Sequence, residues 1–269
     1  MTDDLPDLLR IAEQAVGLGY DIIKNTTPSE IRLKSDRDTV TDVDLKIENE
    51  VREFLRRMTP AAGFLGEEEA STASLDGDQD VWTLDPVDGT SNFAHGLPLC
   101  AVSLALVRGG APVVAAMVAP FLNLRYLAAK GHGAFGNGVR IRVSATTELS
   151  QSIVSIGDYA VGDEAAAKNE RRIRLTTLLA ERVERIRMFG SAALDLAWVA
   201  EGRTDAAVIM ANKPWDTAAG VLLAREAGAN VVDATGAAHS FTSSETIAVN
   251  PHIQRSLLSL TSKIPKGHS

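Results

Sequence analysis

Apolar residues near the start of the chain recur at intervals of three and four, which is the spacing of an amphipathic helix. One such stripe runs from Leu5 to Ile23. A second begins near Asp44 and is stopped by Pro60. Its apolar positions are Ile47, Val51, Phe54 and Met58. The pattern therefore predicts two helices, and the segment between them, KSDRDTVTDVD, is too polar for a core.

The middle of the chain changes to short β-rich runs separated by Gly, Pro and Asn: VWTLD, LCAVSLALV, PVVAAMVA, RYLAA and VRIRV. After TTELSQS, the runs IVSIG, IRMFG, AAVIM, ANVVD and TIAVN alternate with helical stretches near 163–184, 191–201 and 215–227. We therefore expect an α+β half over residues 1–146 and an α/β half over residues 147–269.

Composition narrows the class of protein. The chain has 269 residues, 45% of them apolar and 23% charged, which is typical of a globular protein. No apolar run is long enough for a membrane helix, and the acidic start MTDDLPDLLR is unlike a secretory signal, so we expect a cytoplasmic protein without membrane contact. The formal charge of -8 disfavours nucleic acid as a partner. Cys100 lies in an apolar run and is interpreted as a buried, inert thiol.

The glycines of GHGAFGNG match G-x-G-x-x-G, the pattern of dinucleotide-binding loops. That function requires a helix after the glycines to hold the pyrophosphate. Here Asn137-Gly138 is followed by the strand pattern VRIRV, and Asn-Gly is typical of a β-hairpin. We therefore predict a hairpin instead of a nucleotide site.

The segment WTLDPVDGTSNF is the most informative stretch of the chain. Asp85 and Asp88 follow an apolar run, Pro86 is expected to end the strand, and Gly89 permits a tight turn that exposes backbone N–H groups. Two carboxylates within about 4 Å repel by about 4 kcal/mol unless a cation intervenes. Oxygen ligands favour Mg²⁺ or Mn²⁺. The alternative is that both acids are ordinary turn residues.

Two other acidic segments accompany this one. Gly66-Glu67-Glu68 follows the apolar AAGFL, and Trp215-Asp216 opens a helical stretch. Each has a plainer interpretation, since Glu67 suits a solvated loop and Asp216 suits the first turn of a helix. The amides of Gly89 and Thr90, where a turn leads into a helix, are candidates for holding phosphoryl oxygens.

Taken together, GEE, DPVDGTSNF and WDTAAG resemble the inositol monophosphatase family of metal-dependent phosphomonoesterases, and TVTDVDLKIE, GSAALDLAWVAEG and EAGANVVDATG extend the resemblance over nearly the whole chain. The resemblance implies a layered αβαβα sandwich of the inositol monophosphatase and fructose-1,6-bisphosphatase type. It also implies a homodimer, sensitivity to lithium, and two or three Mg²⁺ ions, for which Mn²⁺ can substitute.

The resemblance also assigns roles to residues. Glu67, Asp85 and the Val87 carbonyl would bind the first ion, and Asp85, Asp88 and Asp216 would share the second. A third ion near Glu67 features in some versions of the mechanism, so Glu67 counts as catalytic. Thr90 and Asp44 would orient or deprotonate the attacking water, although Asp44 also suits simple helix capping. The phosphate is expected among Val87, Asp88, Gly89, Thr90 and Asp216.

Substrate choice is less determined. Gly190, Ser191 and Ala192 match a family segment that touches the alcohol part of the substrate, while Ser191 also suits a helix N-cap. Animal inositol monophosphatases have a glutamate that contacts inositol where this chain has Ile209, so strict inositol specificity is not expected. The leading hypothesis is hydrolysis of a small polyol or sugar phosphate such as inositol 1-phosphate. The alternative substrates are histidinol phosphate and fructose 1,6-bisphosphate. The alternative function is that of a regulatory binding protein that retains the phosphatase fold.

Overall fold

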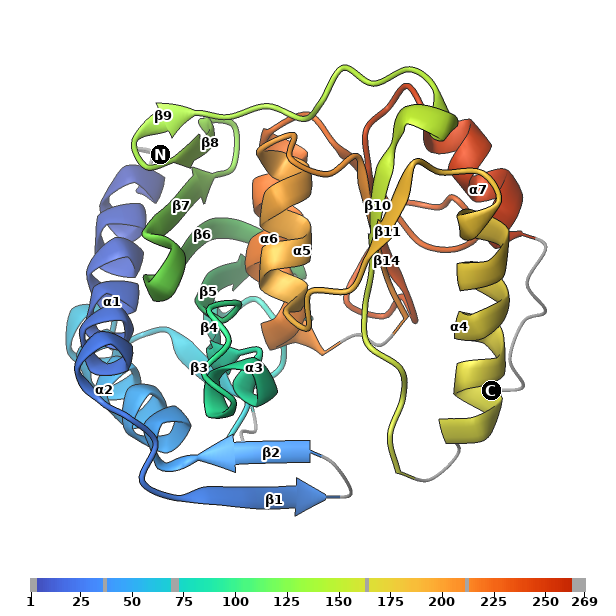
Figure 1. Cartoon of the computed structure of the whole chain (residues 1–269). Helices are drawn as coiled ribbons and strands as arrows, with labels where there is room; N and C mark the ends of the chain where they lie inside the picture. Colours follow the sequence, from blue (N-terminus) through green and yellow to red (C-terminus); the bar gives the residue numbers. More distant parts are fainter. Residues whose placement is uncertain (1–3, 36–37, 69–72, 163–164, 211–212, 263–269) are drawn as a thin grey trace.

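The chain folds into five alternating layers of helices and sheets (Figure 1). The computed structural model describes residues 4–35, 38–68, 73–162, 165–210 and 213–262. Helices α1 (Leu5–Asn25) and α2 (Asp42–Met58) form one outer layer, and α4 (Ala165–Ala180) and α7 (Gln254–Thr261) form the other. Helices α5 (Ala192–Ala200) and α6 (Pro214–Glu226) lie between the two large sheets. This arrangement confirms the predicted αβαβα sandwich.

The first large sheet has seven strands in chain order, and all neighbours are antiparallel except β3 and β4, which run parallel. Its strands are β3 (Gly63–Gly66), β4 (Val81–Asp88), β5 (Ala101–Arg108), β6 (Ala111–Ala119), β7 (Leu124–Ala129), β8 (Gly133–Gly136) and β9 (Val139–Arg140). The short helix α3 (Thr90–Ala94) follows β4, and the 3₁₀ turn η1 (Pro120–Leu122) joins β6 to β7.

Both faces of this sheet are buried, because a helical layer covers each one. Large side chains such as Trp82 and Leu104 pack against α1 and α2. The opposite face is lined by small residues such as Ala105 and Ala115, which let α5 and α6 approach closely. Burial on both faces explains the nearly continuous apolar runs of the sequence in this region. The sheet is therefore a rigid base for whatever lies at the ends of its strands.

The second large sheet has five strands in the order β11-β10-β12-β14-β13. Its strands are β10 (Ile153–Ile156), β11 (Arg185–Arg187), β12 (Ala206–Ile209), β13 (Asn230–Val232) and β14 (Thr246–Val249), and the 3₁₀ turn η2 (Leu149–Gln151) precedes them. β10, β11 and β12 are parallel, whereas β14 is antiparallel to both of its neighbours. The five runs predicted as strands after TTELSQS are all present. The division of the chain at residue 146 remains a prediction.

The predicted hairpin at Asn137-Gly138 is confirmed. Strands β8 and β9 pair with Gly136 opposite Val139, and both turn residues have positive φ angles, 47° for Asn137 and 79° for Gly138. The amides of Gly131 and Gly133 both donate to the Glu226 carboxylate at 2.8 Å. The Glu226 carboxylate thus accepts the hydrogen bonds of the amides that a nucleotide phosphate would need.

The structure corrects several expected boundaries. Strand β4 does not end at Pro86 but continues to Asp88, with an irregularity in its pairing to β5 between Asp85 and Asp88. Strand β9 stops at Arg140, so most of VRIRV is not strand. Part of the polar segment between the first two helices forms a hairpin of β1 (Ile31–Ser35) and β2 (Asp38–Thr41). Helix α7 was not predicted. None of the described helices is long and apolar enough to cross a membrane.

Candidate active site

The two aspartates of β4 are buried where the strand ends. Asp85 is 3% exposed and Asp88 is 4% exposed. The amide of Val87 donates to Asp85 Oδ1 at 3.0 Å. The hydroxyl of Ser191 donates to Asp88 Oδ1, and the amide of Ala193 donates to Asp88 Oδ2 at 3.1 Å. Both acids therefore point into the protein, which excludes the interpretation of solvated turn residues.

The turn after β4 requires glycine for two reasons. Gly89 has a φ of 87°, and a Cβ there would lie 2.7 Å from the Leu99 carbonyl oxygen. The turn leads directly into α3, so Thr90 occupies the first helical position. The Thr90 hydroxyl lies 2.8 Å from the Val87 carbonyl oxygen and 3.1 Å from Asp44 Oδ1. A hydroxyl has one proton, so it donates to one of these acceptors at a time.

Asp44 caps its helix, as the sequence allowed, and it also contacts Thr90. Helix α2 begins at Asp42, two residues earlier than expected, and Thr41 is its N-cap. Asp44 closes a capping box by accepting from the Thr41 amide at 3.0 Å and from the Thr41 hydroxyl. Its other oxygen faces Thr90. Burial raises the pKa of this fully buried carboxyl, and the nearby Glu67 charge adds to the rise. Asp44 is therefore predisposed to take up a proton.

Strand pairing brings Glu67 next to Asp85. In the parallel pair of β3 and β4, Gly66 lies opposite Leu84, so the residues that follow, Glu67 and Asp85, lie side by side at the end of the pair. The Glu67 charge raises the pKa of Asp85, Asp88 and Asp216. Glu67 is half-buried. The register therefore explains why a glutamate and an aspartate separated along the chain share one site.

The start of α5 lies against Asp88. Ser191 is the N-cap of this helix and accepts from the Leu194 amide at 3.2 Å while it donates to Asp88. The backbone amides of Ala192 and Ala193 lower the pKa of Asp88, but burial outweighs them and raises it to about 7. The N-cap interpretation of Ser191 is confirmed. Gly190, Ser191 and Ala192 lie beside Asp88, which accepts hydrogen bonds from Ser191 and Ala193.

Asp216 lies in the first turn of α6, as expected for a helix-starting acid. It is also close to the acids of β4. Burial raises its pKa, Asp88 and Glu67 raise it further, and Lys213 opposes them. Asp216 in turn raises the pKa of Asp85. The charge of Asp216 therefore acts on Asp85 across the end of β4.

The charges of Glu67, Asp88 and Asp216 all act on Asp85, and these four residues are called here the acid cluster. Burial is the largest cause of the raised pKa of each aspartate, and neighbouring carboxylates add to it. Within the described residues, no three acidic, histidine or cysteine side chains stand at the spacing of a metal-binding group. A cation bound here would therefore have to draw the carboxylates together.

Asn92 is a functional candidate that the sequence did not single out. Its side-chain amide donates to the carbonyl oxygens of Leu99 at 2.8 Å and Phe189 at 2.7 Å, and lies 3.3 Å from that of Gly190. Gly190 has a φ of 70°, and a Cβ there would lie 2.9 Å from the Asn92 amide nitrogen. Asn92 thereby ties α3 to the segment before α5. Its place in the DPVDGTSNF motif was the available signal.

Two neighbours of the acid cluster are apolar or inert. Ile209, at the end of β12, is 5% exposed and packs in a core cluster with Leu196 and Val221. It offers no hydrogen bond to a substrate. Cys100 is fully buried, and burial together with the nearby Asp88 raises its pKa to about 12. This confirms the expected inert thiol.

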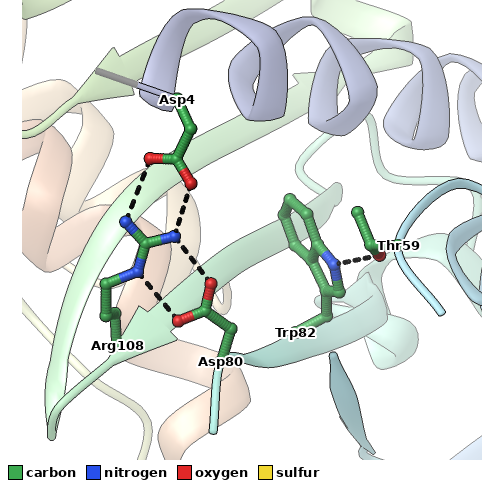
Figure 2. Close-up of polar contacts among 5 residues, drawn as sticks. All are labelled: Asp4, Thr59, Asp80, Trp82 and Arg108. Carbon is green, nitrogen blue, oxygen red and sulfur yellow. Dashed lines mark hydrogen bonds and ion pairs between the residues drawn. The ribbon is translucent and has the colours of Figure 1, made fainter. Parts of the chain in front are cut away.

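A cavity of about 370 Å³ lies away from the acid cluster, at the opposite end of β4. Its lining includes Asp4, Thr59, Asp80 and Trp82. Figure 2 shows that Arg108 bridges Asp4 and Asp80 there, and that the Trp82 indole donates to the Thr59 hydroxyl at 2.9 Å. Asp4 and Asp80 of this cavity are thus paired with a cation that the chain itself supplies.

The sequence model of the inositol monophosphatase family matches residues 4–266, and the chain belongs to that family. The protein is therefore a hydrolase of phosphoric monoesters. It is 40% identical to an inositol-1-monophosphatase of Rhizobium meliloti (strain 1021) over 85% of this chain and 84% of that protein.

Two further comparisons agree. A fructose-1,6-bisphosphatase/inositol-1-monophosphatase of Thermotoga maritima is 38% identical over 74% of this chain and 73% of that protein. The crystal structure of the extragenic suppressor protein suhB from Bartonella henselae superposes with a TM-score of 0.87 at 34% identity, covering 96% of this chain and 99% of that one. The predicted family and fold type are confirmed.

Proposed function

We propose that this protein is a Mg²⁺-dependent phosphomonoesterase of small polyol and sugar phosphates, with inositol 1-phosphate as its leading substrate. The acid cluster is the observation that supports this most directly. Buried aspartates whose pKa is raised by burial and by neighbouring carboxylates need a proton or a cation to share the space, and a divalent ion with hard oxygen ligands fits their chemistry. The cluster faces the Gly89 turn that opens α3.

The residues that would hold Mg²⁺ are Glu67, Asp85, Asp88 and Asp216, with the Val87 carbonyl oxygen as a further ligand. That carbonyl accepts from Thr90 and keeps a second lone pair. Two or three ions fit this set of oxygens. When bound, the ions neutralise phosphate charge, lower the pKa of water and stabilise the leaving oxygen. Mn²⁺ has the same ligand preference.

Thr90 and Asp44 would act on the attacking water. The Thr90 hydroxyl can orient it, and Asp44, whose pKa is raised by burial, can receive its proton through Thr90. The water oxygen bonds to phosphorus and the ester P–O bond breaks. The leaving oxygen takes a proton from solvent water, and Asp44 returns the proton it received to solvent, so that one water is consumed for each alcohol released. The amides of Gly89 and Thr90 would hold phosphoryl oxygens. No phosphorylated protein intermediate is required.

The alcohol part of the substrate would lie beside Gly190, Ser191 and Ala192. Because Ile209 is buried in the core, this side of the pocket offers no carboxylate to the hydroxyl groups of a sugar ring. We therefore propose a broad preference among small phosphates. The name of the Thermotoga maritima relative combines two phosphatase activities, fructose-1,6-bisphosphatase and inositol-1-monophosphatase. This name supports fructose 1,6-bisphosphate as a second substrate.

A substrate panel tests this function. Phosphate release is measured from inositol 1-phosphate, fructose 1,6-bisphosphate and histidinol phosphate, with Mg²⁺ and after its removal by chelation. We expect Mg²⁺-stimulated hydrolysis of the first two and the highest kcat/KM for inositol 1-phosphate. Absence of stimulated release from all three substrates would refute the proposal. A clear preference for histidinol phosphate would keep the chemistry and correct the substrate.

We also propose that the protein is a cytoplasmic homodimer. The exposed apolar side chains of Leu97 and Met188 support the dimer. Asn92 joins the two segments that contain them, because it contacts Leu97 and the neighbour of Met188, Phe189. Light scattering of the purified protein measures its mass in solution. A monomer mass at micromolar concentration would reject the dimer.

A further inference from the structure

Glu48 is a buried carboxylate on α2 that the mechanism above does not use. It is 1% exposed, although four of its neighbours along KIENEVR are polar and its position alone suggests an ordinary charged helix face. Glu48 follows Asp44 by four residues, so both carboxylates project from the same face of α2. Asp44 reaches the turn after β4, and Glu48 reaches the turn after β3.

The contacts of Glu48 fix the backbone on both sides of Glu67. Its Oε2 accepts from the Glu68 amide at 2.9 Å. On the other side, a Cβ at Gly66 would overlap the Glu48 carboxyl group, so glycine is needed for this close approach. Glu67 stands between these two positions. The turn that presents Glu67 to Asp85 therefore rests directly on the Glu48 carboxylate.

The Glu48 side chain is itself held in place. Its Oε1 pairs with the Arg52 guanidinium, one helical turn further along α2. That guanidinium also lies over the ring of Phe64 in β3, with 5.0 Å between the guanidinium carbon and the ring centroid. Arg52 thus connects α2 to the strand that leads into the turn. Each oxygen of Glu48 has a separate partner, which leaves the carboxylate little freedom to rotate.

We propose that Glu48 is a positioning residue for metal binding. It fixes the position of the Glu67 carboxylate by accepting the hydrogen bond of the Glu68 amide, while Arg52 fixes the orientation of the Glu48 carboxylate. The inference rests on the proposed role of Glu67 as a metal ligand. It requires an acceptor oxygen at the distance of a glutamate side chain, and it does not require the negative charge. Partners that orient metal ligands typically change metal affinity or activity by about 10- to 100-fold when they are removed.

Two variants separate reach from charge. Glu48→Gln keeps the length and an acceptor oxygen but loses the charge, whereas Glu48→Asp keeps the charge and withdraws the oxygen by one methylene. Mn²⁺ binding to the full chain is titrated by the electron paramagnetic resonance signal of the free ion. We expect Glu48→Asp to weaken Mn²⁺ binding by about 10-fold or more and Glu48→Gln to stay within about threefold of the wild type. The matched control is Glu53→Asp, at an exposed position of the same helix.

The outcomes are distinct. Wild-type Mn²⁺ affinity in a folded Glu48→Asp protein overturns the inference, and so does weak binding in Glu48→Gln with normal binding in Glu48→Asp. If Glu48→Asp does not fold, the Glu48→Gln result decides alone, because a loss of about 10-fold there contradicts a role that needs only the acceptor. If the wild type binds Mn²⁺ and hydrolyses the phosphate ester, and both variants bind Mn²⁺ with the wild-type affinity, only this inference fails. A wild type that binds no Mn²⁺ refutes the metal site and this inference together.

Discussion

Strand β4 has acidic residues at both ends, and the protein treats the two ends in opposite ways. Asp80 directly precedes the strand and accepts two hydrogen bonds from Arg108, from Nε at 2.8 Å and from Nη2 at 2.7 Å. The same guanidinium donates to Asp4 at 3.1 and 2.9 Å (Figure 2). At the other end, Asp85 and Asp88 are more deeply buried and receive only neutral donors.

The pKa shifts express this difference. Hydrogen bonding to Arg108 holds the pKa of Asp4 below its ordinary value, and the two acids raise the pKa of Arg108. Burial and like charge instead raise the pKa of Asp85. Acids that only stabilise the fold are thus given a cation by the chain itself. The pKa values of Asp85, Asp88 and Asp216 are raised, even though the charge of Lys213 opposes the rise at Asp216, and such perturbed pKa values are a physical signature of a functional site.

The largest effect is expected when the deeply buried end is changed. Asp85→Asn removes a charge from the middle of the acid cluster, and we expect kcat for inositol 1-phosphate to fall by about 10³-fold or more, because the metal contribution of several kcal/mol is lost. The melting temperature without metal should stay the same or rise, since a buried like charge is gone. Phosphate release and circular dichroism measure the two quantities.

The control for this variant lies at the other end of the strand. Asp78→Asn changes an exposed acid that lines the cavity at that end and should leave both kcat and the melting temperature unchanged. Wild-type turnover in Asp85→Asn would contradict the assignment of the acid cluster. Equal losses in both variants would mean that the effect is not local to the site.

Metal removal and pH give the second effect. The pKa values of Asp85, Asp88 and Asp216 are higher in the folded protein than the ordinary value. Protonation of these side chains therefore stabilises the folded state fully below about pH 4. This contribution is lost as the pH rises through the pKa values of the folded protein, about 7 for Asp88. The melting temperature of chelator-treated protein should therefore fall between pH 5 and pH 8.

Added Mg²⁺ should reverse this fall. An ion at about 100 times its Kd stabilises by about 2.7 kcal/mol, which corresponds to roughly 5 to 10 °C in a protein of this size. The gain should be large at pH 8 and much smaller at pH 4.5, where the raised pKa values of Asp85, Asp88 and Asp216 favour their protonated forms. Differential scanning calorimetry measures both. A melting temperature at pH 8 that does not respond to Mg²⁺ would argue against metal binding by these acids.

The two ends of β4 also differ in how far the sequence predicts them. The acids of the cluster lie in compact motifs, and apolar periodicity places those motifs at strand ends and helix starts. Arg108 contacts Asp80 and Asp4 from distant parts of the chain, and no local pattern connects them. Glu48 is similar, because only the approach of Gly66 turns a helix-face charge into a buried one. Contacts that depend on how layers pack are not encoded in spacing.

Secondary structure shows the same limit. Helix α1 and most strands of both large sheets follow from periodicity, since long regular patterns leave little choice, but β3 was not predicted. The β1–β2 hairpin was missed because it has exposed apolar residues, Ile31 at 56% and Leu33 at 71%, amid polar ones, and no buried face marks it. Pro86 was expected to end β4, but the pairing with β5 resumes at Asp88.

The smallest effect is expected at the paired end of β4. Arg108→Ala leaves Asp4 and Asp80 without their shared cation, but the side chains of Arg108 and Asp4 are 38% and 55% exposed, so water screens much of the interaction. We expect a loss of at most about 1 kcal/mol. The loss should shrink in high salt, because exposed ion pairs are screened. Urea denaturation at low and high salt measures it, and kcat/KM should stay at the wild-type value. A loss of catalysis in Arg108→Ala would mean that the two ends of the strand are coupled, and the contrast between a structural and a catalytic end would have to be abandoned.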